Sequence, residues 1–250
     1  MTTTRNAHVY ADFLLRHLTN ETYLVDVGCG SGELSLELAS EVRRITGIDS
    51  DPAEAQLAQR TAESVGARHA AFAVGTVYAL PLPDDEADVV FGHSVLEALD
   101  HPAEALTEMK RVLKPGGVLA VASVEYDGLI LAGPHEQLVR RFFDIRTRLW
   151  RSEGADPYLG RRLRGLLTGV GMVGVEATTK CISYGTAEAV REFGVGRADD
   201  CTDEWFVGAS KRHDLATVDE LNAIRQAWLE WSESPDSYTA FAWCRALGRK

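Results

Sequence analysis

The chain has few cysteines and no long apolar run among its 250 residues. Its four cysteines, Cys29, Cys181, Cys201 and Cys244, show no CxxC spacing, so the sequence gives no indication of a zinc site or a disulfide framework. Apolar runs such as Gly117–Val124 are far too short to cross a bilayer, and the first ten residues lack the apolar core of a secretory signal. We therefore expect a cytoplasmic protein that does not enter a membrane.

Basic residues are also in deficit. The chain has 26 Lys and Arg against 37 Asp and Glu, which gives a formal charge of -11. An acidic surface repels phosphate backbones, so the composition disfavours a nucleic-acid partner unless a local basic patch exists.

Strands and helices alternate through the first half of the chain. The apolar patterns predict strands at residues 22–27, 44–49, 70–75, 88–93 and 117–124, and helices at 33–42, 52–65 and 102–112. Asp51, Pro52 and Glu54 form a strong helix start, with a capping acid, a proline in the first turn and a glutamate three residues after the cap. Alternation with short joints predicts a parallel, doubly wound α/β sheet.

The regular alternation of strands and helices ends in the second half of the chain. A long helix is predicted at 135–153, with Leu138, Phe142, Ile145 and Leu149 on one face, and further strands at 173–184 and 237–247. The residues between these last two strands are helix-like and rich in aromatic side chains.

The first predicted strand ends in the glycine-rich stretch "DVGCGSG". Alternating glycines at a strand–helix turn let the backbone come close to a ligand. A P-loop would end in Gly-Lys-Ser/Thr, and a dinucleotide-binding GxGxxG turn would have glycine where Glu33 stands. An acid in the first helical turn is a poor neighbour for a pyrophosphate, so the turn favours a nucleoside without phosphates.

Asp49 ends the second predicted strand, where it is placed to accept hydrogen bonds from two ribose hydroxyls. The alternative is that the glycines only make a tight turn and Asp49 only caps the next helix.

Several segments carry a family resemblance: "VDVGCGSG", "GIDSDP" and "ALPLPDDEADVVFGHSVLEALDHPAEALTEMKRVLKPGG". They resemble class I S-adenosylmethionine-dependent methyltransferases, most closely the branch related to ubiquinone and menaquinone biosynthesis enzymes. The resemblance covers residues 5–124, and the tail "AWLEWSESPDSYTAFAWCRALGRK" is similar to bacterial small-molecule methyltransferases of this branch. It implies a Rossmann-like seven-stranded sheet, S-adenosylmethionine as the cofactor and S-adenosylhomocysteine as the product.

The resemblance also implies positions for the cofactor. The backbone of Gly28, Cys29 and Gly30 would pack against its methionine part and ribose. Asp26 would anchor the amino group through water, and Asp49 would hold the ribose hydroxyls.

Other positions follow from the ends of later strands. Ser50 would lie beside the adenine. Thr76 stands where the family often has an aspartate, so the backbone and apolar packing of Val77 would hold the adenine instead. His93 lies where the chain of the family passes the methionine moiety. Tyr10 would lie on a lid over the cofactor.

The sulfonium already activates the methyl group, so the enzyme has to align the acceptor and exclude water. An oxygen acceptor also needs its proton removed, and His93, at the end of a central predicted strand, is the first candidate base. Its alternative is a backbone contact with the cofactor. Tyr126 follows the fifth strand and either orients the acceptor or interacts with the sulfonium through its ring. The alternative is a packed loop tyrosine.

Other polar residues are not expected to act in catalysis. Glu97 and His101 flank a helix start and are expected at the surface, and His135 is expected beside a helix cap rather than as a base. A set of aromatic residues either lines an acceptor pocket or packs in a core: Trp205, Phe206, Trp228 and Trp231.

A basic cluster runs through the second half: Arg140, Arg141, Arg146, Arg148, Arg151, Arg161, Arg162 and Arg164. It either attracts an anionic acceptor or nucleic acid, or forms the solvated face of a helix paired with nearby acids.

We expect one methyltransferase domain over residues 1–250. Its expected parts are an N-terminal lid helix (1–20), a cofactor-binding core (21–124), the remaining core (125–184 and 238–250) and a helical insertion that forms the acceptor pocket (185–237). The predicted activity is methyl transfer to an oxygen or nitrogen atom of a small organic molecule. Alternatives are C-methylation of a quinone-like ring and a module that binds the cofactor or its product without turnover. The sequence specifies neither the acceptor nor the oligomeric state.

Overall fold

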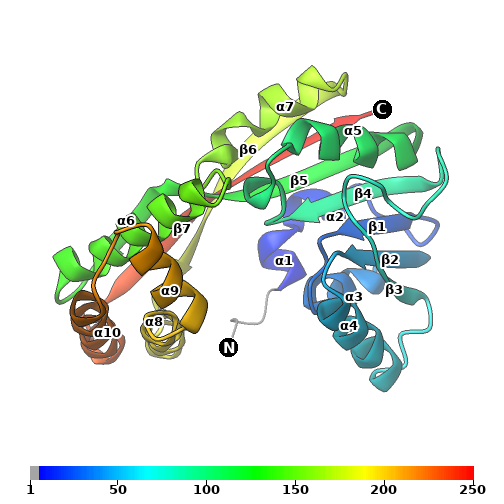
Figure 1. The fold of residues 1–250 in the computed structure, drawn as a ribbon. Coiled ribbons are helices and arrows are strands. Elements are labelled where there is room, and N and C mark those ends of the chain that lie inside the picture. The colour runs from blue at the N-terminus through cyan, green and yellow to red at the C-terminus, as the bar shows by residue number, and fades with distance from the viewer. Residues whose placement is uncertain (1–5) are drawn as a thin grey trace. The chain divides into compact units, whose positions relative to one another are not determined.

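The computed structural model describes residues 6–250, which contain a seven-stranded sheet flanked by helices (Figure 1). The strand order is β3-β2-β1-β4-β5-β7-β6. The strands are β1 (Tyr23–Val27), β2 (Arg44–Asp49), β3 (Ala70–Val74), β4 (Ala87–His93), β5 (Leu113–Ala132), β6 (Val173–Tyr184) and β7 (Tyr238–Arg249). This architecture confirms the predicted doubly wound, Rossmann-like fold.

The first five strands are parallel, as predicted. In the register, Val25 of β1 lies opposite Thr46 of β2 and Val90 of β4, and Phe91 lies opposite Ala120 of β5. The last strand runs the other way. Gly116 and Lys250 are joined by a backbone hydrogen bond at one end of the β5–β7 pair, and the Thr239 hydroxyl donates to the Ile130 carbonyl at the other.

Strand β5 is longer than the predicted 117–124. The stretch "LKPGG" is extended rather than a separate turn, because the backbone of Gly116 and Gly117 pairs with the carboxyl-terminal Lys250. Glu125, Tyr126 and Asp127 therefore lie inside the strand, and the prediction that they follow it is wrong.

Both faces of the sheet are covered by helices. Alternate residues of β1 face opposite sides. Val25 packs in one core with Met109 and Leu163, whereas Leu24 packs in another with Leu38. Helices α5 (Pro102–Val112) and α7 (Leu163–Gly169) lie on the first face, and α3 (Glu33–Ala39) and α4 (Pro52–Ser64) lie on the other (Figure 1). Burial on both faces explains why these strands read as continuous apolar runs.

Helix α4 begins where the sequence signals placed it. Asp51 is the N-cap, its carboxylate accepts a hydrogen bond from the Ala53 amide at 2.7 Å, and Pro52 opens the first turn. The predicted lid helix differs. Residues 1–5 lie outside the described part of the chain, and the following residues form two four-residue helices, α1 (Ala7–Tyr10) and α2 (Asp12–Leu15), instead of one.

The chain forms two compact units. The sheet unit comprises residues 6–123, 159–179 and 244–250, and the helical unit comprises residues 124–158 and 180–243. Strands β5, β6 and β7 contribute residues to both. The helical unit holds α6 (Glu136–Ser152), α8 (Ala187–Asp200), α9 (Glu204–Arg212) and α10 (Val218–Glu233).

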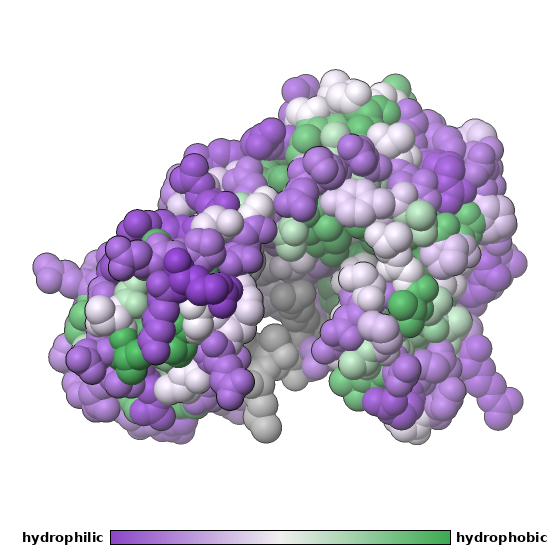
Figure 2. All heavy atoms as spheres, viewed as in Figure 1, coloured by the Kyte–Doolittle hydropathy of each residue, from purple (hydrophilic) through white to green (hydrophobic). Residues whose placement is uncertain are grey.

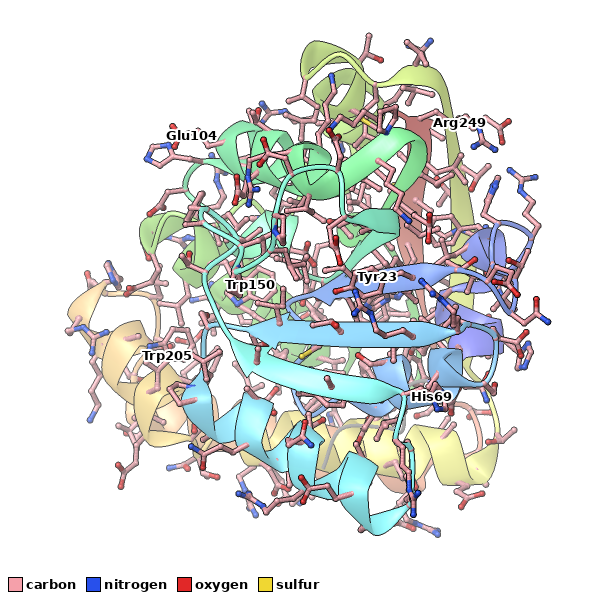
Figure 3. All side chains as sticks on the ribbon, turned by 90° about the vertical axis from the view of Figure 1, so that its right-hand side faces the viewer. Tyr23, His69, Glu104, Trp150, Trp205 and Arg249 are labelled. Carbon is pink, nitrogen blue, oxygen red and sulfur yellow. The ribbon has the colours of Figure 1, made fainter. Side chains whose placement is uncertain are left out.

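Aromatic side chains form the core of the helical unit. Trp228 and Trp231 are fully buried, with ring centroids 5.2 Å apart, and Phe206 is also buried. Trp205, on α9, is half-exposed (Figure 3). Core packing is therefore the role of three members of the predicted aromatic set, and Trp205 lies outside it.

The surface is mostly hydrophilic on the side that Figure 2 draws. Among the helices of residues 6–250, none has both the length and the apolar character needed to cross a membrane.

Candidate functional site

The turn between β1 and α3 is shaped by three glycines with left-handed backbone. Gly28, Gly30 and Gly32 have φ angles of 71°, 53° and 80°. The amides of Gly28 and Cys29 both donate to the Ile48 carbonyl, which ties the turn to the end of β2. Only glycine adopts such angles without strain, so the alternating pattern in the sequence is a conformational requirement.

The three glycines differ in what surrounds them. A Cβ atom on Gly28 would lie 2.3 Å from the Val95 side chain, and one on Gly32 would lie 2.7 Å from Ala58. A Cβ on Gly30 would meet nothing closer than a Glu54 oxygen at 4.0 Å. Gly28 and Gly32 are thus needed for packing within the protein, whereas Gly30 leaves its backbone open to an approaching ligand.

Asp49 faces this open part of the turn. One carboxylate oxygen accepts a hydrogen bond from the Gly30 amide at 2.7 Å, and the other accepts one from the Asp51 amide at 2.9 Å. A carboxylate offers about four acceptor sites, so two remain for hydroxyl donors. The N-cap of α4 is Asp51 rather than Asp49. A nucleoside sugar therefore fits the chemistry of this position.

Asp26 and Cys29 are held below the turn. Asp26 is buried, and the Ser35 hydroxyl donates a hydrogen bond to its carboxylate. Burial raises the pKa of the Cys29 thiol, and the charges of Asp26 and Asp49 raise it further. Cys29 is therefore an uncharged thiol at neutral pH and lacks the thiolate form that acts as a nucleophile.

Ser50, Thr76 and Val77 lie at the same edge of the sheet. The Gly75 amide donates to the Asp49 carbonyl at 2.9 Å, which brings the end of β3 beside the end of β2. Ser50 and Thr76 are exposed, and Val77 packs in the core together with Leu80. The structure thus brings these three predicted positions near Asp49, and their contacts with the adenine stay a prediction.

His93 and Tyr10 come together although they are far apart in the sequence. Their ring centroids are 5.3 Å apart in an edge-to-face arrangement, and the Phe91 ring lies 6.2 Å from His93. His93 is only 4% exposed. The aromatic contact fixes the orientation of the imidazole. The role of His93 as a base stays a prediction.

Glu97 is not at the surface, and that prediction is wrong. It is fully buried, and its carboxylate accepts hydrogen bonds from the hydroxyls of Ser94 at 2.9 Å and Ser123 at 2.7 Å. The short helix Leu96–Ala98 turns the side chain inward. His101 is exposed, as expected.

The sequence offered one missed signal for Glu97. Apolar residues flank it on both sides in "VLEAL", as in a buried segment. One serine donor, Ser94, follows the end of β4 and the other, Ser123, lies within β5, and this pairing is visible only in the fold.

Tyr126 belongs to the helical unit. Its ring packs edge-to-face on Trp150 at 5.6 Å and on Phe241 at 6.0 Å. It is half-buried within a strand and is not a loop residue.

A metal centre is not apparent within residues 6–250. No group of three or more His, Cys, Asp or Glu side chains there is arranged to hold an ion. His135 is the N-cap residue of α6 and contacts Glu230, in line with its expected place beside a helix cap.

Sequence comparison gives an independent view of the sheet unit. Residues 25–121 match the family described as Methyltransferase domain. An uncharacterized methyltransferase of Schizosaccharomyces pombe is 28% identical over 170 residues, which are 64% of this chain and 60% of that protein. The O-methyltransferase rstn1 of Aspergillus nomiae is 33% identical over 125 residues, 49% of this chain and 54% of that protein. The chain thus spans only a little over half the length of these two relatives.

Solved structures share the fold at low sequence identity. The YcgJ protein of Bacillus subtilis superposes with a TM-score of 0.63 at 15% identity, over 96% of this chain and 97% of that one.

Proposed function

We propose that this chain, which carries a class I S-adenosylmethionine-dependent methyltransferase domain, transfers a methyl group to an oxygen or nitrogen atom of a small organic molecule. The observation that carries the proposal is the turn at Gly30, open to a ligand and bonded to the Asp49 carboxylate. S-adenosylmethionine is the cofactor, and it supplies a methyl group already activated by a sulfonium.

The residues of the turn account for the choice of a nucleoside. Asp49 offers acceptors to the ribose hydroxyls, and the open backbone at Gly30 admits the cofactor. Glu33 occupies the first turn of α3. Its negative charge disfavours a phosphate group at that helix end.

The neighbouring aromatic pair supports a role close to the cofactor. Tyr10 covers the His93 ring, and His93 ends β4 at the same edge of the sheet as Asp49. In our proposal His93 accepts the proton of an oxygen acceptor, and Tyr10 orients it and limits access by water. The resemblance to an O-methyltransferase favours oxygen as the accepting atom.

Incubation with methyl-labelled S-adenosylmethionine and fractionated small-molecule extracts tests the proposal. Label is expected in a small organic product, and the position of the new methyl group identifies an oxygen, nitrogen or carbon acceptor. Asp49→Asn is the control and should reduce labelling strongly. If no acceptor fraction gains label across varied extracts while the cofactor still binds, the chain is a binding module and the proposal fails.

A further inference from the structure

Arg146 differs from the solvent-facing members of the basic cluster, because it lies beside a second arginine that is not part of that cluster. Arg140 and Arg148 pair with acids of their own helix, Glu136 and Asp144, on the solvated side of α6. This confirms the solvated-face interpretation for them. Arg146, on α6, instead meets Arg197, on α8, around the single carboxylate of Asp200.

Both guanidinium groups approach the same oxygen atom. Arg146 Nη1 lies 3.1 Å and Arg197 Nε lies 3.3 Å from Asp200 Oδ2. Within residues 6–250, Asp200 is the only acid that forms an ion pair with either arginine. The group therefore has two positive charges and one negative charge.

Hydrogen bonding is also incomplete. The Nε atoms of Arg146 and Arg197 are buried, and neither has a hydrogen-bond partner among the described residues, although Arg197 Nε lies 3.3 Å from Asp200 Oδ2. A guanidinium group presents five donors. Donors remain for an additional acceptor that the described protein atoms do not supply.

Aromatic rings surround the two arginines. The Arg146 guanidinium lies 5.6 Å from the Trp150 ring, and that of Arg197 lies 5.3 Å from the Phe193 ring. Trp150 is labelled in Figure 3. These rings fix the direction of the planar guanidinium groups and reduce their contact with water.

The arginine side chains remain reachable. Arg146 is 23% and Arg197 is 27% exposed, so the pair is partly desolvated but not sealed. Burial and the neighbouring charge of Arg146 lower the pKa of Arg197. An arginine still stays protonated at neutral pH, and an excess positive charge in such surroundings is unfavourable until an anion joins it.

We propose that Arg146 and Arg197 bind the oxyanion group of a small molecule at the helical unit. The ligand then has a carboxylate or phosphate attached to an apolar or aromatic body. Paired guanidinium donors suit the planar carboxylate and the phosphate alike, and the neighbouring rings suit the apolar part.

Calorimetry on the full chain with saturating S-adenosylhomocysteine tests the assignment. The anionic probes are benzoate and phenyl phosphate, and the neutral probe of similar shape is benzamide. At least one anionic probe is expected to bind the wild type at least tenfold more tightly than benzamide. The probe that binds more tightly distinguishes a carboxylate ligand from a phosphate ligand.

Variants then locate the site. Arg197→Gln should weaken the preferred anionic probe at least tenfold, Arg197→Lys should restore part of that affinity, and Arg148→Gln, on the solvated side of α6, should leave it unchanged. Affinity for S-adenosylhomocysteine should be the same in all three. Equal binding of benzamide and both anionic probes to the wild type would overturn the assignment without reference to any variant, as would an equal loss in Arg148→Gln.

The outcome is separable from that of the proposed function. Anion binding is measured without methyl transfer, so label transfer can fail while the oxyanion site stands.

Discussion

Asp49 connects the backbone of the glycine turn to the start of α4 through its two carboxylate oxygens. In the proposed function the same oxygens receive the ribose hydroxyls. Asp49→Asn is therefore expected to lower affinity for S-adenosylmethionine by about 10- to 100-fold, because a hydrogen bond to a charged group is worth roughly 1.5–3 kcal/mol. Calorimetric titration measures the change.

Asp51→Asn is the matched control for Asp49. Asp51 is two residues away and caps α4, and asparagine caps as well as aspartate. This variant should bind the cofactor as the wild type does. Unchanged affinity in Asp49→Asn would remove the ribose assignment.

Glu97 shows how a single buried carboxylate joins the end of β4 to the middle of β5. The side chain receives the hydroxyls of Ser94 and Ser123, and Ser94 has a left-handed backbone with φ of 60°. Glu97→Ala would leave these two donors without that acceptor. We expect the free energy of unfolding to fall by about 2–3 kcal/mol.

Urea denaturation measures this loss. Glu104→Ala, an exposed acid of α5 labelled in Figure 3, is the control and should change stability by less than about 0.5 kcal/mol. A loss in Glu97→Ala no greater than in Glu104→Ala would mean that the buried hydrogen bonds contribute little.

At the scale of elements, the turn between β1 and α3 separates a packing role from a binding role. Gly28→Ala places a methyl group against Val95 at 2.3 Å and imposes a left-handed angle on alanine. It should reduce the free energy of unfolding by about 2–4 kcal/mol.

Gly30→Ala should behave differently. Its methyl group meets open space, so the stability cost should be only about 1 kcal/mol from the backbone angle. Cofactor affinity should fall, because the methyl group occupies the space through which the ligand approaches. Equal stability losses in the two variants, or normal cofactor binding by Gly30→Ala, would contradict this division of roles.

For the whole molecule, acid stability depends on carboxylates whose charged form is favoured by the fold. Hydrogen bonds from Arg111 lower the pKa of Glu108 against the opposing effect of burial, and the Leu80 amide lowers it further. A depressed pKa means that the stabilisation is present above the ordinary value of 4.5 and is lost as the pH falls through the lower folded value.

Glu108→Gln should therefore lower the free energy of unfolding by about 1 kcal/mol at pH 7 and reduce its decline between pH 5 and pH 3. Urea denaturation across this range gives the measurement. Glu104→Gln, on the same helix, should retain the pH dependence of the wild type. An identical decline in Glu108→Gln and the wild type would show that this ion pair contributes nothing to acid stability.

Local signals predicted much of the fold. Strands β2 and β6 have the predicted bounds, residues 44–49 and 173–184, because each is an uninterrupted extended pattern between turn signals. Asp51 and Pro52 predicted the start of α4 through interactions confined to one helical turn. Strand β5 was predicted too short because its ends depend on pairing with β7, more than a hundred residues away.

The candidate site likewise has parts that local sequence predicts and parts that depend on distant segments. The sequence alone determined the glycine turn and the strand-end position of Asp49, since both follow from local backbone geometry and the alternation of strands and helices. Only the tertiary structure decided that Tyr10 covers His93, that Glu97 is buried, and that Arg146 faces Arg197 while Arg148 faces solvent. The physical reason is that the environment of a polar side chain is set by the elements packed against it, and a single sequence contains the side chain but not its neighbours in space.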